Sequence, residues 1–522
     1  MHTGGRWAVT SGLLLALLSM AAWQVGAQPG MLAPASLVRY EVDFLTYLGG
    51  SGSDMVRDMT VDVEGNLYVA GVVSSADFPR TPGAIPGQSK GGGMVAKLSP
   101  TGQLLWSRVV GGRDVSYLYS VEVDRAGYVY VAGRMGPGFP TTPGAPQLKA
   151  NHNCGFVGKL KPDASDWVWA TYVGTGYAVR DMTLDDRGDV YATLDYFAES
   201  PEHLPAEWFA NAYQKSPHSG GNHFGKSDAG LLKLSGEGKV LWASWIGGSN
   251  GNDWVASVGV GADHCPVIFL NTYSDDMPTT PEAFCKTPCK SWVGKLSEDG
   301  SRLIFGTYTG TAASTAEVPF ARTHNVAVDH HGDVFIAFVS NSVPVTAGAF
   351  QSRCGGRGDF AIEKISPTGA LLAATFLGGN GNETNGPDEI VVDAEGDVMV
   401  AGGSSSTDFP VTPGSLQPHN AGAGGKFPFD GIVSVLSGDL SRLLYSSYLG
   451  GTGDEMARAC CFGAGGMLYV AGVTTSRDFP SKNAFQSTYG GDPGFGATPN
   501  GGQFPVGWGN GDAWAAKLRP AR

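Results

Sequence analysis

Arginine, histidine and acidic residues recur at the start of a short apolar segment that the sequence repeats several times. They are Arg57, Asp58, Arg180, Asp181, His324, Asp388, Glu389 and Arg458. Paired carboxylates beside arginine or histidine can exchange protons with a substrate or hold an anionic sugar. The same residue types also form structural charge pairs along water-filled channels. We favour the structural interpretation and keep all eight residues as candidate binding residues.

Aromatic residues in two long insertions form a second candidate set. Trp208 and Phe209 lie in the insertion 198–228, and Trp508 lies in the insertion 486–512. Aromatic side chains on long loops can stack on sugar rings or anchor a protein partner. The alternative is that these side chains pack their own loops against the protein.

Glycine-rich links between the repeated segments carry Asp54, Asp253 and Asp454. Oxygen-rich loops of this kind suit calcium, which makes these residues candidate metal ligands. The links lack the alternating carboxylates of a calcium motif, so the favoured interpretation is an aspartate that caps a glycine turn. No cofactor is firmly implied, and calcium is the one that the sequence allows.

The chain contains seven cysteines, and two of them share the short loop FCKTPCK. A disulfide between Cys285 and Cys289 is therefore predicted, provided that the protein is exported to an oxidising compartment. An odd number of cysteines leaves at least one thiol without an intramolecular partner.

The candidate residues are positioned by a repeat that runs through nearly the whole chain. Its clearest marker is a link such as YLGG at 47–50, and the first glycine of each link falls at 49, 111, 174, 247, 310, 378 and 450. Each unit contains four short alternating segments separated by glycine and proline turns, which is typical of β-strands. Units of this length, with four strands each, are the size of a propeller blade.

The repeated motifs resemble the SBBP repeat family, whose name stands for seven-bladed β-propeller. The shared motifs are Y-L-G-G, D-x-x-G-N/D-x-Y-V-A-G, D-F-P-x-T-P-G-A and V-A-K-L, and the resemblance covers residues 37–522. The third unit lacks the T-P-G-A element, and the fourth replaces the Asp and Gly of the D-x-x-G turn with Asp263-His264-Cys265-Pro266. The resemblance implies an all-β propeller with seven four-stranded antiparallel blades. It also implies an exported bacterial protein, and it carries no catalytic motif.

The last unit ends after its third strand, WAAKL at 514–518. A strand at 37–50, which contains VRYEVDFLTYLGG, would supply the missing fourth strand and close the ring by pairing with 513–518. Closure removes the exposed sheet edges that invite aggregation. We therefore predict one closed propeller domain over residues 37–522. The alternatives are an open solenoid and a second domain with its own start, and the seven units with complementary half-repeats favour closure.

The predicted strands place the connections on two faces. The short D-x-x-G and S-P-T-G turns share one face, whereas the links and the long T-P-G-A loops share the other. Large, variable loops are where binding sites usually lie. We therefore expect the long-loop face to carry any binding site.

The N-terminal residues predict export. Residues 1–27 combine Arg6, the apolar run LLLALLSMAA and the small-residue end Val25-Gly26-Ala27, which is the pattern of a secretory signal. Residues 28–36 would be a short linker. No later segment is apolar enough to span a membrane. A net charge of −13 without a lysine or arginine cluster argues against nucleic acid or anionic lipid as a partner.

These features favour an exported, non-catalytic binding or scaffold protein that presents a loop-rich propeller face to a glycan or a protein. It would be secreted, periplasmic or attached to the cell surface. One alternative is a polysaccharide lyase or hydrolase with its site at the channel mouth, and another is a purely structural surface module. Propellers host both binding proteins and enzymes, so the fold alone does not choose between them.

Overall fold

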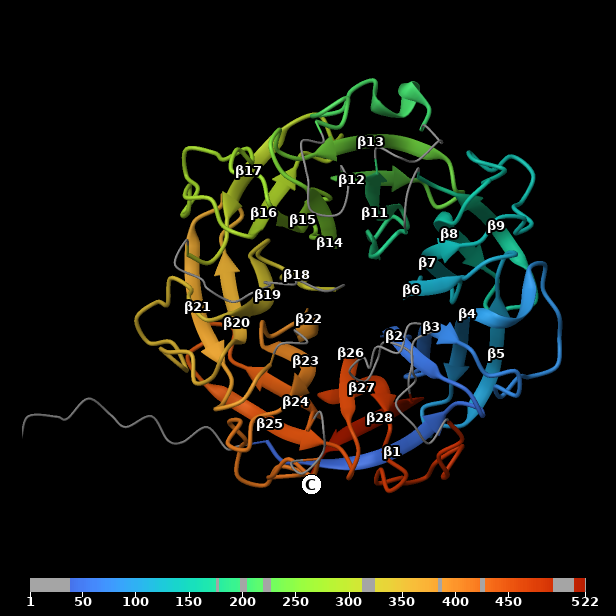
Figure 1. Cartoon of the computed structure of the whole chain (residues 1–522), viewed down its shortest axis with the longest axis vertical. Coiled ribbons are helices and arrows are strands. Elements are labelled where there is room, and N and C mark those ends of the chain that lie inside the picture. Colours follow the sequence, from blue (N-terminus) through green and yellow to red (C-terminus); the bar gives the residue numbers. More distant parts are fainter. Residues whose placement is uncertain are drawn as a thin grey trace, which may run out of the picture. The chain divides into compact units, whose positions relative to one another are not determined.

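The seven repeats fold into seven antiparallel sheets of four strands each, which follow one another as blades around a ring (Figure 1). The computed structural model describes residues 38–174, 178–197, 204–218, 227–311, 324–383, 387–422, 428–491 and 511–521. Residues 38–522 form one unit of the chain. The all-β, seven-bladed architecture predicted from the sequence is confirmed.

Each blade runs from an innermost to an outermost strand. Blade 1 contains β2 (Asp54–Val61), β3 (Leu67–Val73), β4 (Gln88–Leu98) and β5 (Leu104–Val110). Blade 2 contains β6 (Tyr117–Val123), β7 (Val129–Met135), β8 (Cys154–Leu160) and β9 (Trp167–Tyr172). Blade 3 contains β10 (Met182–Leu184), β11 (Val190–Phe197), β12 (Ser227–Leu234) and β13 (Val240–Ile246). Blade 4 contains β14 (Asp253–Val260), β15 (Pro266–Thr272), β16 (Ser291–Leu296) and β17 (Leu303–Tyr308). Blade 5 contains β18 (Val326–Val328), β19 (Val334–Ser340), β20 (Asp359–Ile365) and β21 (Leu371–Leu377). Blade 6 contains β22 (Pro387–Val392), β23 (Val398–Ser404), β24 (Asp430–Leu436) and β25 (Leu443–Leu449). Blade 7 contains β26 (Glu455–Gly463), β27 (Met467–Thr474), β28 (Asp512–Pro520) and β1 (Tyr40–Leu48).

The described residues contain one short 3-10 helix, η1 (Ala206–Phe209), within the insertion of blade 3. No helix in this described part of the chain has the length and hydropathy that crossing a bilayer requires.

The hydrophobic core lies between the blades. Every residue of β3 but one is buried, because its two faces pack against different neighbours. Seven clusters of buried apolar residues each combine side chains from two adjacent blades. In one of them Trp106 of blade 1 lies with Phe156 of blade 2. Each sheet therefore depends on its neighbours for the burial of both of its faces.

The last blade is completed by the first strand. β1 pairs antiparallel with β28, with Tyr47 opposite Trp514 and Tyr40 opposite Pro520. The sheet order β1-β28-β27-β26 makes β1 the outermost strand of blade 7 (Figure 1). This is the pairing that the incomplete final repeat predicts.

The tyrosine of the Y-L-G-G motif ties the long loop of its blade to the outermost strand. In blade 6 the Tyr448 hydroxyl donates to the Ser406 carbonyl at 2.6 Å and accepts the Phe409 N–H at 3.1 Å. The same pair of hydrogen bonds is made in three other blades by Tyr47, Tyr172 and Tyr308. The motif therefore has a structural reason that does not involve a ligand.

The long loops continue along the outer edge of their own blade. In blade 6 the Thr412 N–H donates to the Ser446 carbonyl at 3.1 Å, and the Tyr448 N–H donates to the Gln417 carbonyl at 3.2 Å. Pairing of this kind protects an edge strand from other chains. Only the remainder of each long loop is thus available to a partner, which weakens the reason for expecting the site on that face.

Candidate functional site

A β-bulge in the innermost strands aims the polar candidate residues. In β2 the register shifts between Val56 and Asp58, which leaves Arg57 without a partner on β3. The innermost strands of blades 2, 4, 6 and 7 shift at the corresponding place. Because a bulge turns a side chain away from the regular alternation, polar residues are tolerated here in an otherwise apolar strand.

The starts of the innermost strands bring His324 together with two of the predicted acids. Its Nδ1 lies 2.8 Å from Asp181 Oδ1, and its Nε2 lies 2.9 Å from the Tyr119 carbonyl oxygen and 3.8 Å from Asp58 Oδ2. Burial lowers the pKa of His324, but the Asp181 and Asp58 charges outweigh it and hold the pKa well above its ordinary value. At neutral pH the ring is an imidazolium that donates from both nitrogens. Residues from blades 1, 2, 3 and 5 thus meet at one point.

We call the polar residues at the start of the innermost strands the belt. Three acids of the belt each join one blade to the next. Asp58 Oδ2 accepts the Val121 N–H of blade 2 at 2.6 Å. Asp181 Oδ2 accepts the Val258 N–H of blade 4 at 2.8 Å, and Glu389 Oε2 accepts the Cys460 N–H of blade 7 at 2.6 Å. Their carboxylates are therefore occupied by protein groups, as the structural interpretation of the sequence predicts.

The three predicted arginines have partners other than His324 among the contacts of the described residues. Arg458 Nη1 pairs with Asp388 Oδ1 at 3.3 Å, and both side chains are buried. Arg180 Nε donates to Asp195 Oδ2 at 3.0 Å, within its own blade. The Arg57 guanidinium lies over the Tyr119 ring, 5.5 Å from its centre.

A cavity of about 260 Å³ lies in the channel beside this belt. Because alternate residues of a strand share one face, the cavity is lined by residues two positions beyond the belt. Each blade contributes one of them: Thr60, Glu122, Thr183, Gly259, Ala327, Val391 and Cys461. The innermost strands run from the links toward the D-x-x-G turns, so the cavity lies on the short-turn side of the belt. The sequence analysis missed Glu122 and Cys461, although counting three residues on from the unpaired residue of each bulge would have found both.

Three of the ionisable groups that line this cavity are held in their neutral forms, whereas the His324 imidazolium and the carboxyl groups of Asp58 and Asp181 line it too. Burial, together with the Asp58 and Asp181 charges, raises the pKa of Glu122 to about 8. Burial also raises the pKa of the Cys461 thiol and that of the Glu389 carboxyl well above their ordinary values. At neutral pH the cavity therefore offers hydroxyl and aliphatic groups and the carboxylic acid of Glu122, beside the charged His324.

The predicted aromatic residues of blade 3 are packing residues. Trp208 and Phe209 are buried in the cluster between blades 2 and 3. Phe209 stacks on Trp245 of β13, with ring centres 5.3 Å apart and an interplanar angle of 10°. The third aromatic candidate, Trp508, lies outside the described residues.

The predicted metal ligands cap the links of their own blades. Asp54 Oδ2 accepts the Gly50 N–H at 2.7 Å, and Asp253 Oδ2 accepts the Gly248 N–H at 2.8 Å. In blade 7 this role belongs to Glu455, whose Oε2 accepts the Gly451 N–H at 2.8 Å, whereas burial raises the pKa of the adjacent Asp454 to about 6. Calcium binding at Asp54, Asp253 and Asp454 stays a prediction.

The structure has Cys285 and Cys289 as free thiols, so the predicted disulfide is not formed in it. Their side chains face different backbone groups. Cys285 Sγ lies 3.5 Å from the Thr287 carbonyl oxygen, and Cys289 Sγ lies 3.4 Å from that of Ser291 and close to that of Thr309.

Comparison with known proteins recovers the repeat family. The family model SBBP, described as a beta-propeller repeat, matches residues 43–79, which include most of β1 and all of β2 and β3. No curated protein matches the sequence.

Solved structures with a related arrangement differ widely in function. Hydrazine synthase of Kuenenia stuttgartiensis is 11% identical with a TM-score of 0.42, and the match covers 81% of this chain and 92% of that one. The polysaccharide lyase Uly1 is 8% identical with a TM-score of 0.42, over 92% and 98% of the two chains. At this level of likeness neither structure carries an argument about function. The chain thus contains an SBBP beta-propeller repeat at residues 43–79, and its described part forms seven propeller blades.

Proposed function

We propose that this is an exported, non-catalytic binding protein whose ligand enters the central channel from the short-turn face. The observation that supports this function is the state of the belt. The carboxyl groups of Asp58, Asp181 and Glu389 accept backbone N–H groups of the following blades. Groups engaged in this way stabilise the ring and are poorly placed to exchange protons with a substrate.

The lining of the cavity suits the uncharged end of a glycan. Thr60 and Thr183 offer hydroxyl groups, the protonated Glu122 offers a donor and an acceptor, and Ala327 and Val391 offer apolar surface. Small-molecule sites combine apolar walls with a few placed polar groups in this way. A volume of about 260 Å³ is near the lower end of such sites, so it would take a terminal sugar rather than a whole chain.

Binding of a glycan panel to the purified protein tests this proposal. Glu122→Arg places a long cation in the cavity, and we expect it to weaken glycan binding at least tenfold, measured by calorimetry. Glu64→Arg is the matched control, because Glu64 is exposed on the D-x-x-G turn of blade 1, outside the cavity. Equal binding by the two variants would place the site elsewhere, and a wild-type protein that binds no glycan would favour a protein partner or a structural module.

One observation favours an enzyme as the second candidate. A carboxylic acid, Glu122, faces the cavity next to an imidazolium, His324, so a proton donor and a cation lie together. A lyase or hydrolase would release sugar ends, and Glu122→Gln would abolish that release while leaving binding nearly intact. Sugar release that Glu122→Gln abolishes would replace the binding proposal, and binding without release would support it.

A further inference from the structure

Blade 4 breaks the pattern of the short-turn face at one residue. The turn after the innermost strand has a left-handed glycine in five blades, with φ between 79° and 88°, at Gly65, Gly127, Gly188, Gly332 and Gly396. In blade 4 this place is taken by His264, with φ of 55°, and its N–H donates to the Gly261 carbonyl as the Gly65 N–H does to the Asp62 carbonyl. Left-handed backbone suits glycine and strains other residues. The turn itself therefore gives no reason for a histidine.

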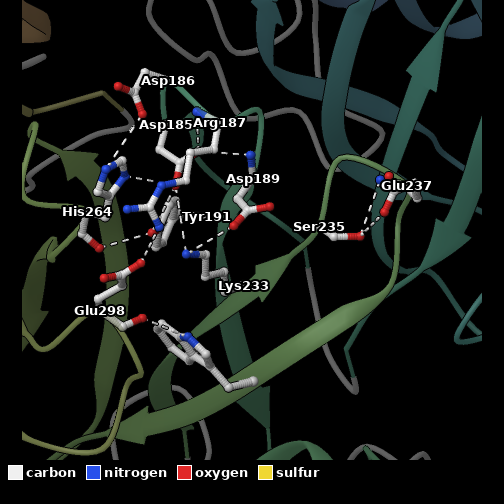
Figure 2. Close-up of polar contacts among 11 residues, drawn as sticks. Asp185, Asp186, Arg187, Asp189, Tyr191, Lys233, Ser235, Glu237, His264 and Glu298 are labelled. Carbon is white, nitrogen blue, oxygen red and sulfur yellow. Dashed lines mark hydrogen bonds and ion pairs between the residues drawn. The ribbon is translucent and has the colours of Figure 1, made fainter.

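The imidazole of His264 reaches the D-x-x-G turn of blade 3 (Figure 2). Its Nδ1 lies 3.2 Å from Asp185 Oδ2, and its Nε2 lies 3.6 Å from Asp186 Oδ1. Asp185 uses its other oxygen to accept the N–H groups of Arg187 and Asp189, which fixes its orientation. The Tyr191 hydroxyl donates to the His264 carbonyl at 3.0 Å, which stabilises the backbone of the histidine.

The three side chains have the separations of metal ligands. One ligand atom from each of Asp185, Asp186 and His264 lies within 4.8 Å of the other two. Tetrahedral zinc with bonds of about 2.0 Å to nitrogen and oxygen separates its ligand atoms by roughly 3.3 Å. The 3.2 Å between His264 Nδ1 and Asp185 Oδ2 matches this separation, whereas the 3.6 Å to Asp186 Oδ1 is measured from Nε2, which does not bind the same ion as Nδ1. The Asp185 side chain is 1% exposed and that of Asp186 is 63% exposed, so the site is anchored on one side and open to water on the other.

The side chains around the site carry a net negative charge that a divalent cation would balance. Four carboxylates, Asp185, Asp186, Asp189 and Glu298, face two cations, Lys233 and Arg187 (Figure 2). With a neutral imidazole the group carries 4 − 2 = 2 uncompensated negative charges. Lys233 lies nearer to Asp189 Oδ2, at 3.2 Å, than to Asp185 Oδ2, at 3.8 Å, and Arg187 pairs with Glu298 at 2.5 Å. Both cations thus have partners of their own beside the three candidate ligands.

We propose that Asp185, Asp186 and His264 bind a divalent first-row transition-metal ion that ties the turn of blade 3 to the turn of blade 4. One imidazole nitrogen and two carboxylate oxygens are the donor set that zinc and its neighbours accept. Water completes the coordination on the exposed side. The competing explanation is an imidazolium that pairs with the two carboxylates and needs no metal.

Metal titration of the purified protein tests the proposal. With zinc as the probe, calorimetry of the wild type should show a site that His264→Gly removes and Asp186→Asn weakens at least tenfold. His264→Gly restores the residue that five other blades use, so this variant should fold normally. His331→Ala is the matched control, because it removes an exposed imidazole from the turn of blade 5 and should leave the site intact.

Cobalt(II) distinguishes this site from the seven cysteines. Ligation by nitrogen and oxygen gives visible bands without the ultraviolet charge-transfer band of a thiolate. We expect the visible bands in the wild type and not in His264→Gly, and we expect zinc to raise Tm in the wild type alone. Identical metal binding by the wild type and His264→Gly would overturn the proposal. So would a wild type that binds neither metal, which would leave the imidazolium ion pair as the explanation of His264.

Discussion

Glu363 is a buried carboxyl group at a place where four other blades have a small residue. It precedes the lysine of the third strand, as do Ala96, Gly158, Gly294 and Ala516. Its Oε1 accepts the Gly310 N–H at 3.2 Å, whereas no described residue bonds to its Oε2. Burial raises the pKa of this carboxyl to about 8. The folded protein therefore prefers Glu363 protonated, and the charged form opposes folding.

This preference predicts a pH-dependent gain of stability for Glu363→Gln. Between the ordinary glutamate pKa and about 8, the folded state binds the proton more tightly than the unfolded state does, so wild-type stability falls as pH rises through that window. Glutamine has no proton to lose. Its free energy of unfolding should match that of the wild type near pH 5 and exceed it at pH 9 by on the order of 4 kcal/mol.

Urea unfolding at the two pH values measures this difference. Glu64→Gln, at an exposed glutamate, should show no such pH dependence. A Glu363→Gln effect of equal size at both pH values would show that the carboxyl group is not protonated in the folded protein.

At the scale of elements, the repeat is held together by contacts between loops and strands. The Tyr448 hydroxyl satisfies both the Ser406 carbonyl and the Phe409 N–H, which lie at the start of the long loop. Removal of one partner leaves buried polar groups without hydrogen bonds, and each such group is costly. The loop would then be less firmly held against its edge strand.

Tyr448→Phe should therefore lower the free energy of unfolding by about 1–3 kcal/mol. Hydrogen exchange should speed up first at Phe409 and in the loop that follows it. Tyr128→Phe is the control, because no hydrogen bond of the Tyr128 hydroxyl to a described residue is found, and its ring lies beneath Lys159. Equal losses in the two variants would assign the effect to ring packing and not to the hydroxyl.

The sequence predicted these elements better than it predicted the contents of the site. Because the same pattern occurs seven times, the sequence predicts the strands, the turns and the ring closure even where a single repeat departs from the pattern. The polar belt was visible because Asp58 and His324 interrupt apolar strands. By contrast, the burial of Trp208 depends on how its loop lies on blade 3, and the sequence of the loop does not encode that directly. His264 was visible as a departure, but its partners Asp185 and Asp186 belong to a different repeat.

At the scale of the whole molecule, the ring depends on one non-local pairing. β1 and β28 pair across nearly the whole length of the described chain, and the Ala521 N–H donates to the Arg39 carbonyl at 2.7 Å. A permuted protein that begins at residue 51 and carries residues 38–50 after residue 522, through a short linker, should make the same last blade. We expect its Tm to lie within a few degrees of the parent, measured by calorimetry.

Deletion of residues 38–50 without reattachment is the matched comparison for that permuted protein. It leaves β28 as an exposed edge strand, so we expect aggregation and a much lower Tm. A deletion variant as stable as the parent would show that the β1 pairing contributes little to the ring.

The geometry of this last blade also has a mechanical consequence. Because Tyr40 lies opposite Pro520, both ends of the described chain leave the β1–β28 ladder at the same end. Tension between those two ends would break the hydrogen bonds of the ladder one after another, starting at the end where both chains leave it. It would not load all of these hydrogen bonds at once in shear. A pulling experiment on the two ends should therefore peel β1 away at low force, while tension applied across a single internal blade would meet greater resistance.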